Sequence, residues 1–210
     1  MKKVAVVILN WNGEKLLKQF LPSVVQTLPE YAEVIIADNA STDNSIHFLN
    51  SSYPGVKIIQ NTTNGGFAKG YNEALKHINN EYLVLLNSDI ETPNNWIEPV
   101  IDFMEKDPKI GAAMPKILQY QKKTHFEYAG AAGGYIDQWG FPFCRGRIFN
   151  TLEKDEGQYN NNTPVFWATG ACMFVRNELF KKTKGFDEFF FAHMEEIDLC
   201  WRMQRAGYLI

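Results

Sequence analysis

"YLVLLNSDIE", residues 82–91, is the stretch from which the fold is best predicted. Five apolar or aromatic residues follow one another without alternation, and the run stops abruptly at Asn87-Ser88-Asp89. Three similar runs precede it, namely "VAVVIL" (4–9), "EVIIA" (33–37) and "VKIIQ" (56–60). Such β-branched, unalternating runs are typical of strands buried on both faces of a parallel sheet.

Helical patterns separate these runs. One apolar face recurs at three and four spacing along Leu16, Leu17, Phe20, Leu21, Val24, Val25 and Leu28. A second helix is expected to start near Ser45, and a third to run through 71–78. Strand and helix in alternation predict an α/β fold, with a doubly wound, mostly parallel sheet flanked by helices.

The second half of the sequence is less regular. Residues 118–162 are rich in Gly, Asn and aromatic residues and predict a loop and hairpin insertion within one domain. Residues 165–176 resume a strand pattern, and 195–207 predict a short helix that ends at Gly207. The aromatic side chains of this half that are expected in the core are Trp167, Trp201 and Phe189 to Phe191.

Composition narrows the functional classes. The 210 residues are 45% hydrophobic, which suits one large domain. The net charge of −3 and the lack of a basic patch argue against nucleic acid as a partner, while a mild acidic excess fits a cation site. Three dispersed cysteines, Cys144, Cys172 and Cys200, favour a reducing compartment. The N-terminal apolar run is too short for a signal peptide, so a cytoplasmic location is predicted.

A polar cluster follows each of the four early strands. The clusters lie at 10–13, 38–43, 61–72 and 87–89. Because the carboxyl ends of parallel strands share one edge, where open α/β sheets bind ligands, we expect these clusters to form one crevice. Ordinary turn and helix-capping chemistry is the alternative explanation for each cluster.

The Gly-rich stretch "GGFAKGYN" (65–72) matches neither the dinucleotide-binding fingerprint nor the P-loop. It predicts a turn into a helix N-terminus, which presents backbone N–H groups to an anion.

A second acidic cluster comprises Glu195, Glu196 and Asp198. Acids in a first helical turn complement the helix dipole, and Asp198 with Arg202 makes an i, i+4 pair. The functional alternative is a general base, which needs one carboxylate within reach of the proton it takes. Spacing does not choose between Glu195 and Glu196.

Read in order, six segments resemble the family 2 glycosyltransferases, including their rhamnosyltransferase-like bacterial members. The matching segments are "VAVVILNWNG", "VIIADNASTDNS", "NTTNGGFAKGYNEAL", "YLVLLNSDIE", "WATGACMFVR" and "GFDEFFFAHMEEIDLCWRMQRAGY". They cover nearly the whole chain in the family's order. The resemblance implies a GT-A fold, with a Rossmann-like nucleotide-binding half at 1–117 and an acceptor-binding half at 118–210.

The resemblance also implies a metal and a nucleotide site. Asp89 matches the last acid of the family's DxD-like motif, which holds Mg²⁺ or Mn²⁺ against the donor diphosphate. Asn87 departs from the acidic form of that motif, and Ser88 lies between them. The remaining residues implied to contact the nucleotide are Leu9, Asn10 and Asp38 at the base, and Asn64, Gly65 and Asn72 beside it.

By the same matching, Glu196 takes the position of the catalytic base in the family's acid pair, with Glu195 as the open alternative. Gly170 and Ala171 match the segment beneath the donor sugar and acceptor. The implied reaction is direct displacement, in which an acceptor hydroxyl attacks the anomeric carbon as the nucleoside diphosphate leaves and the anomeric centre is inverted.

The partners implied are a UDP- or dTDP-sugar and a saccharide or lipid-linked acceptor, in bacterial surface polysaccharide or glycan synthesis. The chain would act in the cytoplasm, with peripheral association at the inner face of the membrane as a second setting. Its ending at Tyr208-Leu209-Ile210, which reads as a strand just begun, predicts a domain truncated at its C-terminus. The alternatives are a non-catalytic sugar- or nucleotide-binding module with a decayed site, and a sugar nucleotidyltransferase.

Overall fold

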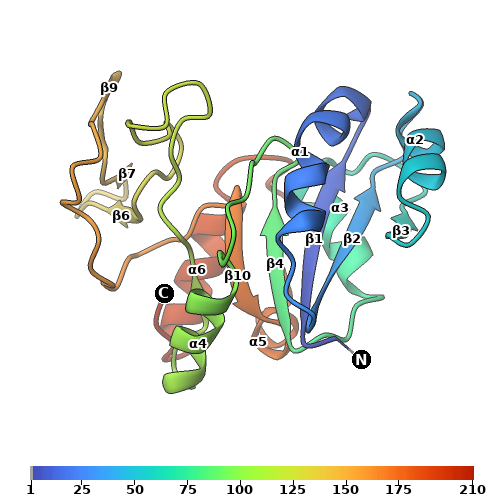
Figure 1. The fold of residues 1–210 in the computed structure, drawn as a ribbon. Coiled ribbons are helices and arrows are strands. Elements are labelled where there is room, and N and C mark those ends of the chain that lie inside the picture. Colours follow the sequence, from blue (N-terminus) through green and yellow to red (C-terminus); the bar gives the residue numbers. More distant parts are fainter. Residues whose placement is uncertain (1) are drawn as a thin grey trace.

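The structure, a computed structural model, describes residues 2–210. Within that range a central sheet has the strand order β3-β2-β1-β4-β10-β5 (Figure 1). Its strands are β1 (Val4–Asn10), β2 (Ala32–Asp38), β3 (Lys57–Gln60), β4 (Tyr82–Leu86), β5 (Ala112–Ala113) and β10 (Cys172–Arg176). The first four are parallel, as predicted, and β10 is antiparallel to both β4 and β5.

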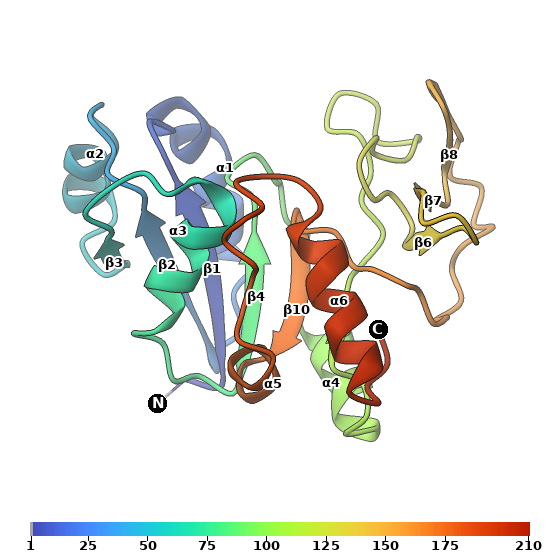
Figure 2. The ribbon, with the colours of Figure 1, turned by 180° about the vertical axis from the view of Figure 1, so that it is seen from behind.

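Helices cover both faces of the sheet because neighbouring residues on each buried strand point to opposite sides. One face carries α1 (Glu14–Gln26), α2 (Ser45–Ser52) and α4 (Glu98–Lys106), whose apolar side chains pack on Val6, Val34 and Val84. The opposite face, seen in Figure 2, carries α3 (Gly66–Leu75), α5 (Asn177–Lys182) and α6 (Glu195–Arg205). The doubly wound prediction is therefore confirmed.

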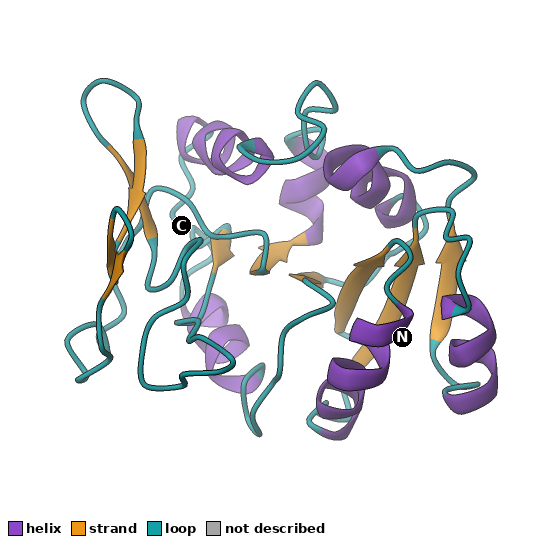
Figure 3. Ribbon diagram, turned by 90° about the horizontal axis from the view of Figure 1, so that it is seen from above, coloured by secondary structure: helices purple, strands orange, loops and turns teal. Residues whose placement is uncertain are grey.

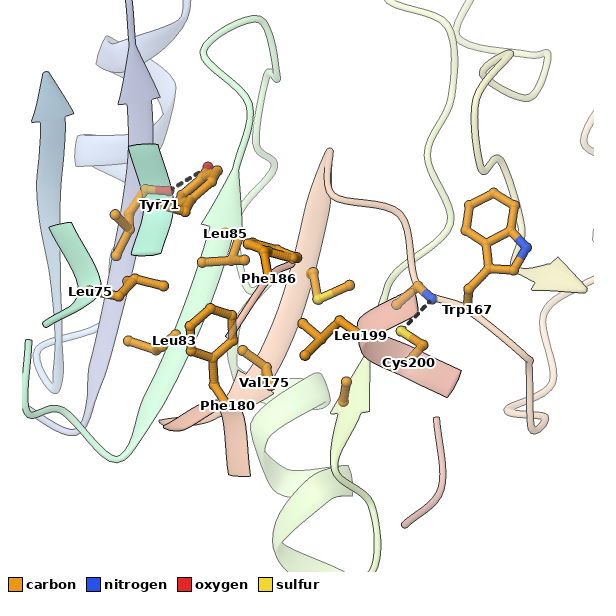
Figure 4. Close-up of a cluster of buried hydrophobic side chains, with 14 of the residues drawn as sticks. Tyr71, Leu75, Leu83, Leu85, Trp167, Val175, Phe180, Phe186, Leu199 and Cys200 are labelled. Carbon is orange, nitrogen blue, oxygen red and sulfur yellow. Dashed lines mark hydrogen bonds between the residues drawn. The ribbon is translucent and has the colours of Figure 1, made fainter. Parts of the chain in front are cut away.

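Figure 4 shows the core of this second face. Tyr71 and Leu75 of α3 pack beside Leu83 and Leu85 of β4, and Leu199 and Cys200 of α6 lie farther along the same layer. The fully buried Tyr71 hydroxyl donates to the backbone oxygens of Val7 and Leu86 at 3.3 Å each. The core thus runs without a break from the nucleotide-binding half that was predicted into the second half, and it holds α3 and α6 on one layer.

The predicted insertion consists of irregular chain with two small hairpins. These are β6 (Gly134–Ile136) with β7 (Pro142–Cys144), and β8 (Arg147–Ile148) with β9 (Thr151–Leu152). They stand to one side of the central sheet (Figure 3). Across residues 2–210 no helix is long and apolar enough to cross a membrane.

Several local expectations need correction. The third helix begins at Gly66 instead of Tyr71 and ends at Leu75, because Gly65 already serves as its N-cap. Of the strand expected over 165–176, only β10 forms, and Trp167 instead makes an isolated bridge to Gly134. Leu209 likewise makes an isolated parallel bridge to Ile110, beside β5. Helices α4 and α5 were not predicted.

The predictions for the buried aromatic side chains are only partly confirmed. Trp167 is buried as expected, whereas Phe189 is 90% exposed, Phe191 65% and Trp201 50%. Trp201 is on the outer side of α6, where its ring meets Phe166 edge to face. The predicted core placement of Phe189, Phe191 and Trp201 is therefore wrong. A run of phenylalanines gave no sign that the chain would loop outward there.

Candidate active site

A pocket of about 690 Å³ lies at the carboxyl end of β4. Both predicted halves of the chain contribute to its walls. Asn87 and Asp89 line it from the segment after β4, and Glu195 and Glu196 line it from the start of α6. Gly170, Ala171 and Cys172 form a further part, at the entry to β10. Asp89, Glu196 and Gly170, which the resemblance implies as metal ligand, base and substrate contact, therefore share one cavity although they are far apart in sequence.

The Asn87–Asp89 segment is fixed through its backbone. The Asn87 N–H donates to the carbonyl oxygen of Ala171 at 3.0 Å, which joins the end of β4 to the strand antiparallel to it. Antiparallel pairing of Leu86 with Cys172 sets this register. The side chain of Asp89 is exposed, and it has no hydrogen bond or ion pair with the part of the chain that is described. Its carboxylate is thus available to a ligand in the pocket.

Glu195 and Glu196 open helix α6 and are unusual for helix-terminal acids in being enclosed. The side chain of Glu195 is only 4% exposed, and Glu196 is partly buried. One oxygen of each carboxyl, Oε2, is buried without a hydrogen-bond partner among the described residues. Buried polar atoms rarely lack a partner in folded proteins, and a catalytic role is one of the explanations for such an exception.

Burial affects the charge of both groups. It raises the pKa of the Glu195 carboxyl to about 7, and the charge of Glu196 adds to that rise. Burial also raises the pKa of Glu196 above its ordinary value, but its own backbone N–H, the charge of His193 and the backbone N–H of Gly170 oppose the rise. Two neighbouring carboxyls whose environments differ are typical of sites that separate acid and base roles.

The turn before α6 has a constrained backbone. His193 and Met194 both adopt positive φ, at 72° and 73°, which is unfavourable for side chains of this size. The Phe191 carbonyl accepts a hydrogen bond from the Phe67 N–H at 2.8 Å, which fastens the turn to α3. A Cβ on Gly66 would lie 2.5 Å from that carbonyl, so this close approach requires glycine. These contacts direct Glu195 and Glu196 toward the pocket.

The predicted nucleotide-base residues form a different kind of cluster. Strand register places Asn10 beside Asp38. Asn10 Nδ2 donates to Asp38 Oδ1 at 2.9 Å and to Ser41 Oγ at 3.0 Å, and the Ser41 N–H donates to Asp38 Oδ2 at 3.0 Å. Asn10 Oδ1 is buried without a partner among the described residues. Leu9, next to Asn10, is partly buried, and none of these residues lines the 690 Å³ pocket.

The residues predicted beside the nucleotide have structural partners. Asn64 Oδ1 accepts from the Gly66 N–H at 2.9 Å and from Asn39 Nδ2 at 2.8 Å. With Phe67 donating to Phe191, two N–H groups at the start of α3 are thus already bonded within the protein. The helix start predicted to face an anion therefore has two of its amides occupied in this conformation.

Asn72 also lies elsewhere than expected. Its side chain donates to the Phe186 carbonyl at 2.8 Å and accepts from the Phe186 N–H at 3.0 Å. Asn72 therefore anchors the segment that leads to α6, and it does not line the pocket.

Sequence reasoning missed two groups of residues. Asn39 is buried and connects Asn61, Asn64 and the Gly66 carbonyl. Its position directly after Asp38 was the available signal. The second group forms the far wall of the pocket and includes Trp96, Ile117, Tyr120 and the ion pair between Lys123 and Glu91, at 2.6 Å. That wall comes from segments without periodicity, so no pattern marked it.

The available metal donors are few. No group of three His, Cys, Asp or Glu side chains that could hold one ion occurs within residues 2–210. Asp89 and Asn87 offer one carboxylate and one amide oxygen at the same pocket wall. Hard oxygen donors of this kind suit Mg²⁺ or Mn²⁺ when substrate phosphates complete the coordination. The donor set therefore fits an ion shared with a phosphate ligand and does not fit a protein-enclosed site.

Comparison with known protein families and sequences finds glycosyltransferases in each case. The model of the family described as "Glycosyl transferase family 2" matches residues 5–184. An N-acetylglucosaminyl-diphospho-decaprenol L-rhamnosyltransferase of Mycobacterium tuberculosis (strain H37Rv) is 26% identical, over 97% of this chain and 71% of its own length. Rhamnosyltransferase WbbL of Escherichia coli (strain K12) is 24% identical, over 97% of this chain and 78% of its own.

Solved structures share the fold. The mannosyltransferase PcManGT from Pyrobaculum calidifontis, in complex with GDP-Man and Mn²⁺, superposes with a TM-score of 0.68 at 16% identity over 99% of this chain. Residues 1–349 of TarS from S. aureus, in complex with UDP, give 0.62 at 20% identity over 95% of this chain. The chain spans 53% and 54% of these two structures. The predicted GT-A fold is confirmed by this likeness.

Proposed function

The chain belongs to glycosyl transferase family 2, and from that premise we propose that it transfers a sugar from a nucleoside-diphosphate sugar to a hydroxyl acceptor, with inversion at the anomeric carbon. The observation that supports this most is the shared pocket, which holds the exposed carboxylate of Asp89 and the buried carboxyl pair at the start of α6. Transfer needs both kinds of group, one to face the diphosphate and one to take a proton.

Glu196 acts as the general base. Its environment favours the ionised form more than that of Glu195 does, because His193 and the Gly170 N–H lie near it. An acceptor hydroxyl bound in the pocket gives its proton to Glu196 while its oxygen forms a bond to the anomeric carbon. The bond from that carbon to the diphosphate oxygen breaks, and the nucleoside diphosphate leaves with the electron pair. Attack from the face opposite the leaving group inverts the centre.

Asp89 and Asn87 would hold a divalent cation, Mg²⁺ or Mn²⁺, at the pocket wall where the donor diphosphate binds. Such an ion supplies positive charge that offsets the charge growing on the leaving group. Ser88 lies between them on the same short segment. The PcManGT complex, which shares this fold, was solved with Mn²⁺, and this supports the proposal by analogy.

The donor and the acceptor bind to opposite halves of the chain. Residues 1–117 bind the nucleotide sugar, with Leu9, Asn10 and Asp38 near the base and Asn64, Gly65 and Asn72 shaping the neighbouring loops. Residues 118–210 bind the acceptor, with Gly170 and Ala171 beneath the reacting sugar. We expect a UDP- or dTDP-sugar as donor. A lipid-linked saccharide is the preferred acceptor, because the M. tuberculosis relative is named for a diphospho-decaprenol substrate.

The test is a donor panel. UDP-, dTDP- and GDP-sugars with Mn²⁺ are screened by thermal shift, and those that bind are assayed for nucleoside diphosphate release with lipid-linked and free saccharide acceptors. We expect one nucleotide class to raise the melting temperature and to be turned over when an acceptor is added. Binding without release under any condition would favour the non-catalytic module instead, for which the neutral Asn87 is the supporting feature.

A further inference from the structure

Glu195 is the most enclosed acidic side chain in the pocket. It is 4% exposed and its Oε2 has no partner within the described chain. The neighbouring Glu196 also has a buried, unpartnered Oε2. Ionising both carboxyls is unfavourable in free energy, because burial penalises each charge and the two charges repel each other.

The surrounding groups offer too little positive charge to offset two negative charges. On α6, Asp198 accepts from Arg202 Nη2 at 2.7 Å, so that guanidinium is already paired. The charge of His193, in the turn before α6, lowers the pKa of Glu196 and does not contribute to that of Glu195.

Positively and negatively charged side chains line the other pocket walls, but the positively charged ones already form ion pairs. Lys123 pairs with Glu91 at 2.6 Å, and Lys116 pairs with Asp155 at 2.6 Å. Asp89 and Glu127 add negative charge. Tyr120, Cys172 and the neighbouring Cys200 complete the titratable groups, and burial raises the pKa of both thiols to about 12, so the cysteines stay neutral.

The two carboxyls differ in what favours ionisation. Glu195 is only 4% exposed, whereas Glu196 is half-buried. The charge of His193 and the Gly170 N–H favour the ionised form of Glu196, whereas for Glu195 only its own backbone N–H does so. A proton shared by the pair is therefore more stable on Glu195.

We propose that Glu195 and Glu196 hold one proton between them and that this proton resides on Glu195, which leaves Glu196 as the single ionised base. The proposal rests on the proposed function for the role of Glu196, and it makes Glu195 a positioning residue that sets the charge of its neighbour. A neutral Glu195 also limits the negative charge that an incoming diphosphate meets. Ionisation of Glu195 at higher pH adds a second charge to the pocket and weakens donor binding.

The direct test needs no activity. Protein labelled with ¹³C at the glutamate carboxyl carbons is titrated by NMR, and the Glu195→Gln and Glu196→Gln variants assign the two signals. We expect the Glu195 signal to titrate at about pH 7. The Glu196 signal should titrate at a lower pH than the Glu195 signal, and the Glu195 midpoint should fall in Glu196→Gln, because the neighbouring charge is gone. Equal midpoints, or a higher midpoint for Glu196, would overturn the proposal.

The kinetic test uses the pH profile. Gln imitates the protonated form of Glu195, so in Glu195→Gln the acidic limb of kcat/KM should stay at the wild-type pH. Above pH 7 the donor KM of the wild type should rise roughly threefold or more, and that rise should vanish in the variant. The matched control is Glu178→Gln, which removes an exposed acid from the first turn of α5, outside the pocket, and should reproduce the wild-type profile.

Two results would contradict the assignment. A shift of the acidic limb to lower pH in Glu195→Gln would mean that Glu195 had been charged beside Glu196. A loss of transfer as large as in Glu196→Gln would make Glu195 the base. If the wild type itself transfers no sugar, the proposed function fails while the NMR titration still decides where the proton resides.

Discussion

Two polar regions at the carboxyl edge of the sheet differ in how their side chains are bonded. At the ends of β1 and β2, Asn10, Asp38, Asn39 and Asn64 bond mainly to one another and to nearby backbone. At the pocket, the Asp89 carboxylate is exposed, and Glu195 and Glu196 each keep a buried Oε2 without a partner in the described chain, whereas Asn10 Oδ1 is the single oxygen in that state among the described side chains of the first region. The first region stabilises the fold, and the second carries a cost in stability that a bound substrate can offset.

The comparison predicts that changes in the first region lower stability, whereas changes in the second lower activity and can raise stability. The four predictions that follow test this contrast, in order of decreasing effect.

Glu196→Gln should give the largest effect. The variant keeps the shape of the side chain and removes its basicity, so sugar transfer should fall by roughly 10²- to 10⁴-fold. Nucleoside diphosphate release in the presence of acceptor measures this, and donor affinity by calorimetry should change little. Near-native turnover would remove Glu196 from the role of base and weaken the functional reading of the pocket.

Glu195→Gln should raise stability at neutral and alkaline pH. A carboxyl whose pKa is raised in the folded state stabilises the protein fully below its unfolded pKa, near 4.5, and loses that contribution as pH rises through about 7. Between pH 4.5 and pH 7 the unfolding free energy of the wild type should fall by roughly 2–3 kcal/mol, whereas that of the variant should not fall.

Urea unfolding of both proteins at pH 5 and pH 8 checks this prediction. The difference in unfolding free energy between them should widen toward pH 8. If the unfolding free energies of the two proteins changed with pH in parallel, Glu195 would be in a solvated environment. The contrast between the pocket and the β1–β2 cluster would then be removed.

Asn39→Ala should destabilise the protein by roughly 1–3 kcal/mol, because it removes a buried side chain that bonds Asn61, Asn64 and the buried Gly66 carbonyl. Denaturant unfolding at pH 7 measures the change. The matched control is Asn161→Ala, in an exposed loop, which should alter stability by less than about 0.5 kcal/mol. Equal effects in the two variants would show that the β1–β2 cluster contributes little to the fold.

Asp89→Asn should give the smallest of these effects. Loss of the exposed Asp89 carboxylate at the pocket wall should weaken Mn²⁺-dependent nucleotide binding about tenfold, equivalent to about 1.4 kcal/mol. Calorimetry with UDP, with and without Mn²⁺, measures it, and melting temperature should not fall because Asp89 is exposed. Asp102→Asn, an exposed acid of α4, is the control. An unchanged dependence on Mn²⁺ would assign the ion to other donors.

The sequence alone determined the parallel part of the sheet. Unbroken apolar runs require strands covered on both faces, so β1, β2 and β4 could be predicted within one or two residues. Because parallel strands end at one edge, the same reasoning placed Asn10, Asp38 and Asn87 along that edge. The family resemblance added Glu196 and Gly170, which the structure brings into one pocket with Asp89.

Only the tertiary structure decided which polar atoms are bonded and which are free. Asn72 anchors Phe186, a partner 114 residues away, and a backbone hydrogen bond to Phe67 fastens the turn that carries the exposed Phe191. The burial of Glu195 depends on the same turn. Local propensity carries no information on such contacts, because hydrogen bonding and desolvation depend on atoms brought together from distant parts of the chain.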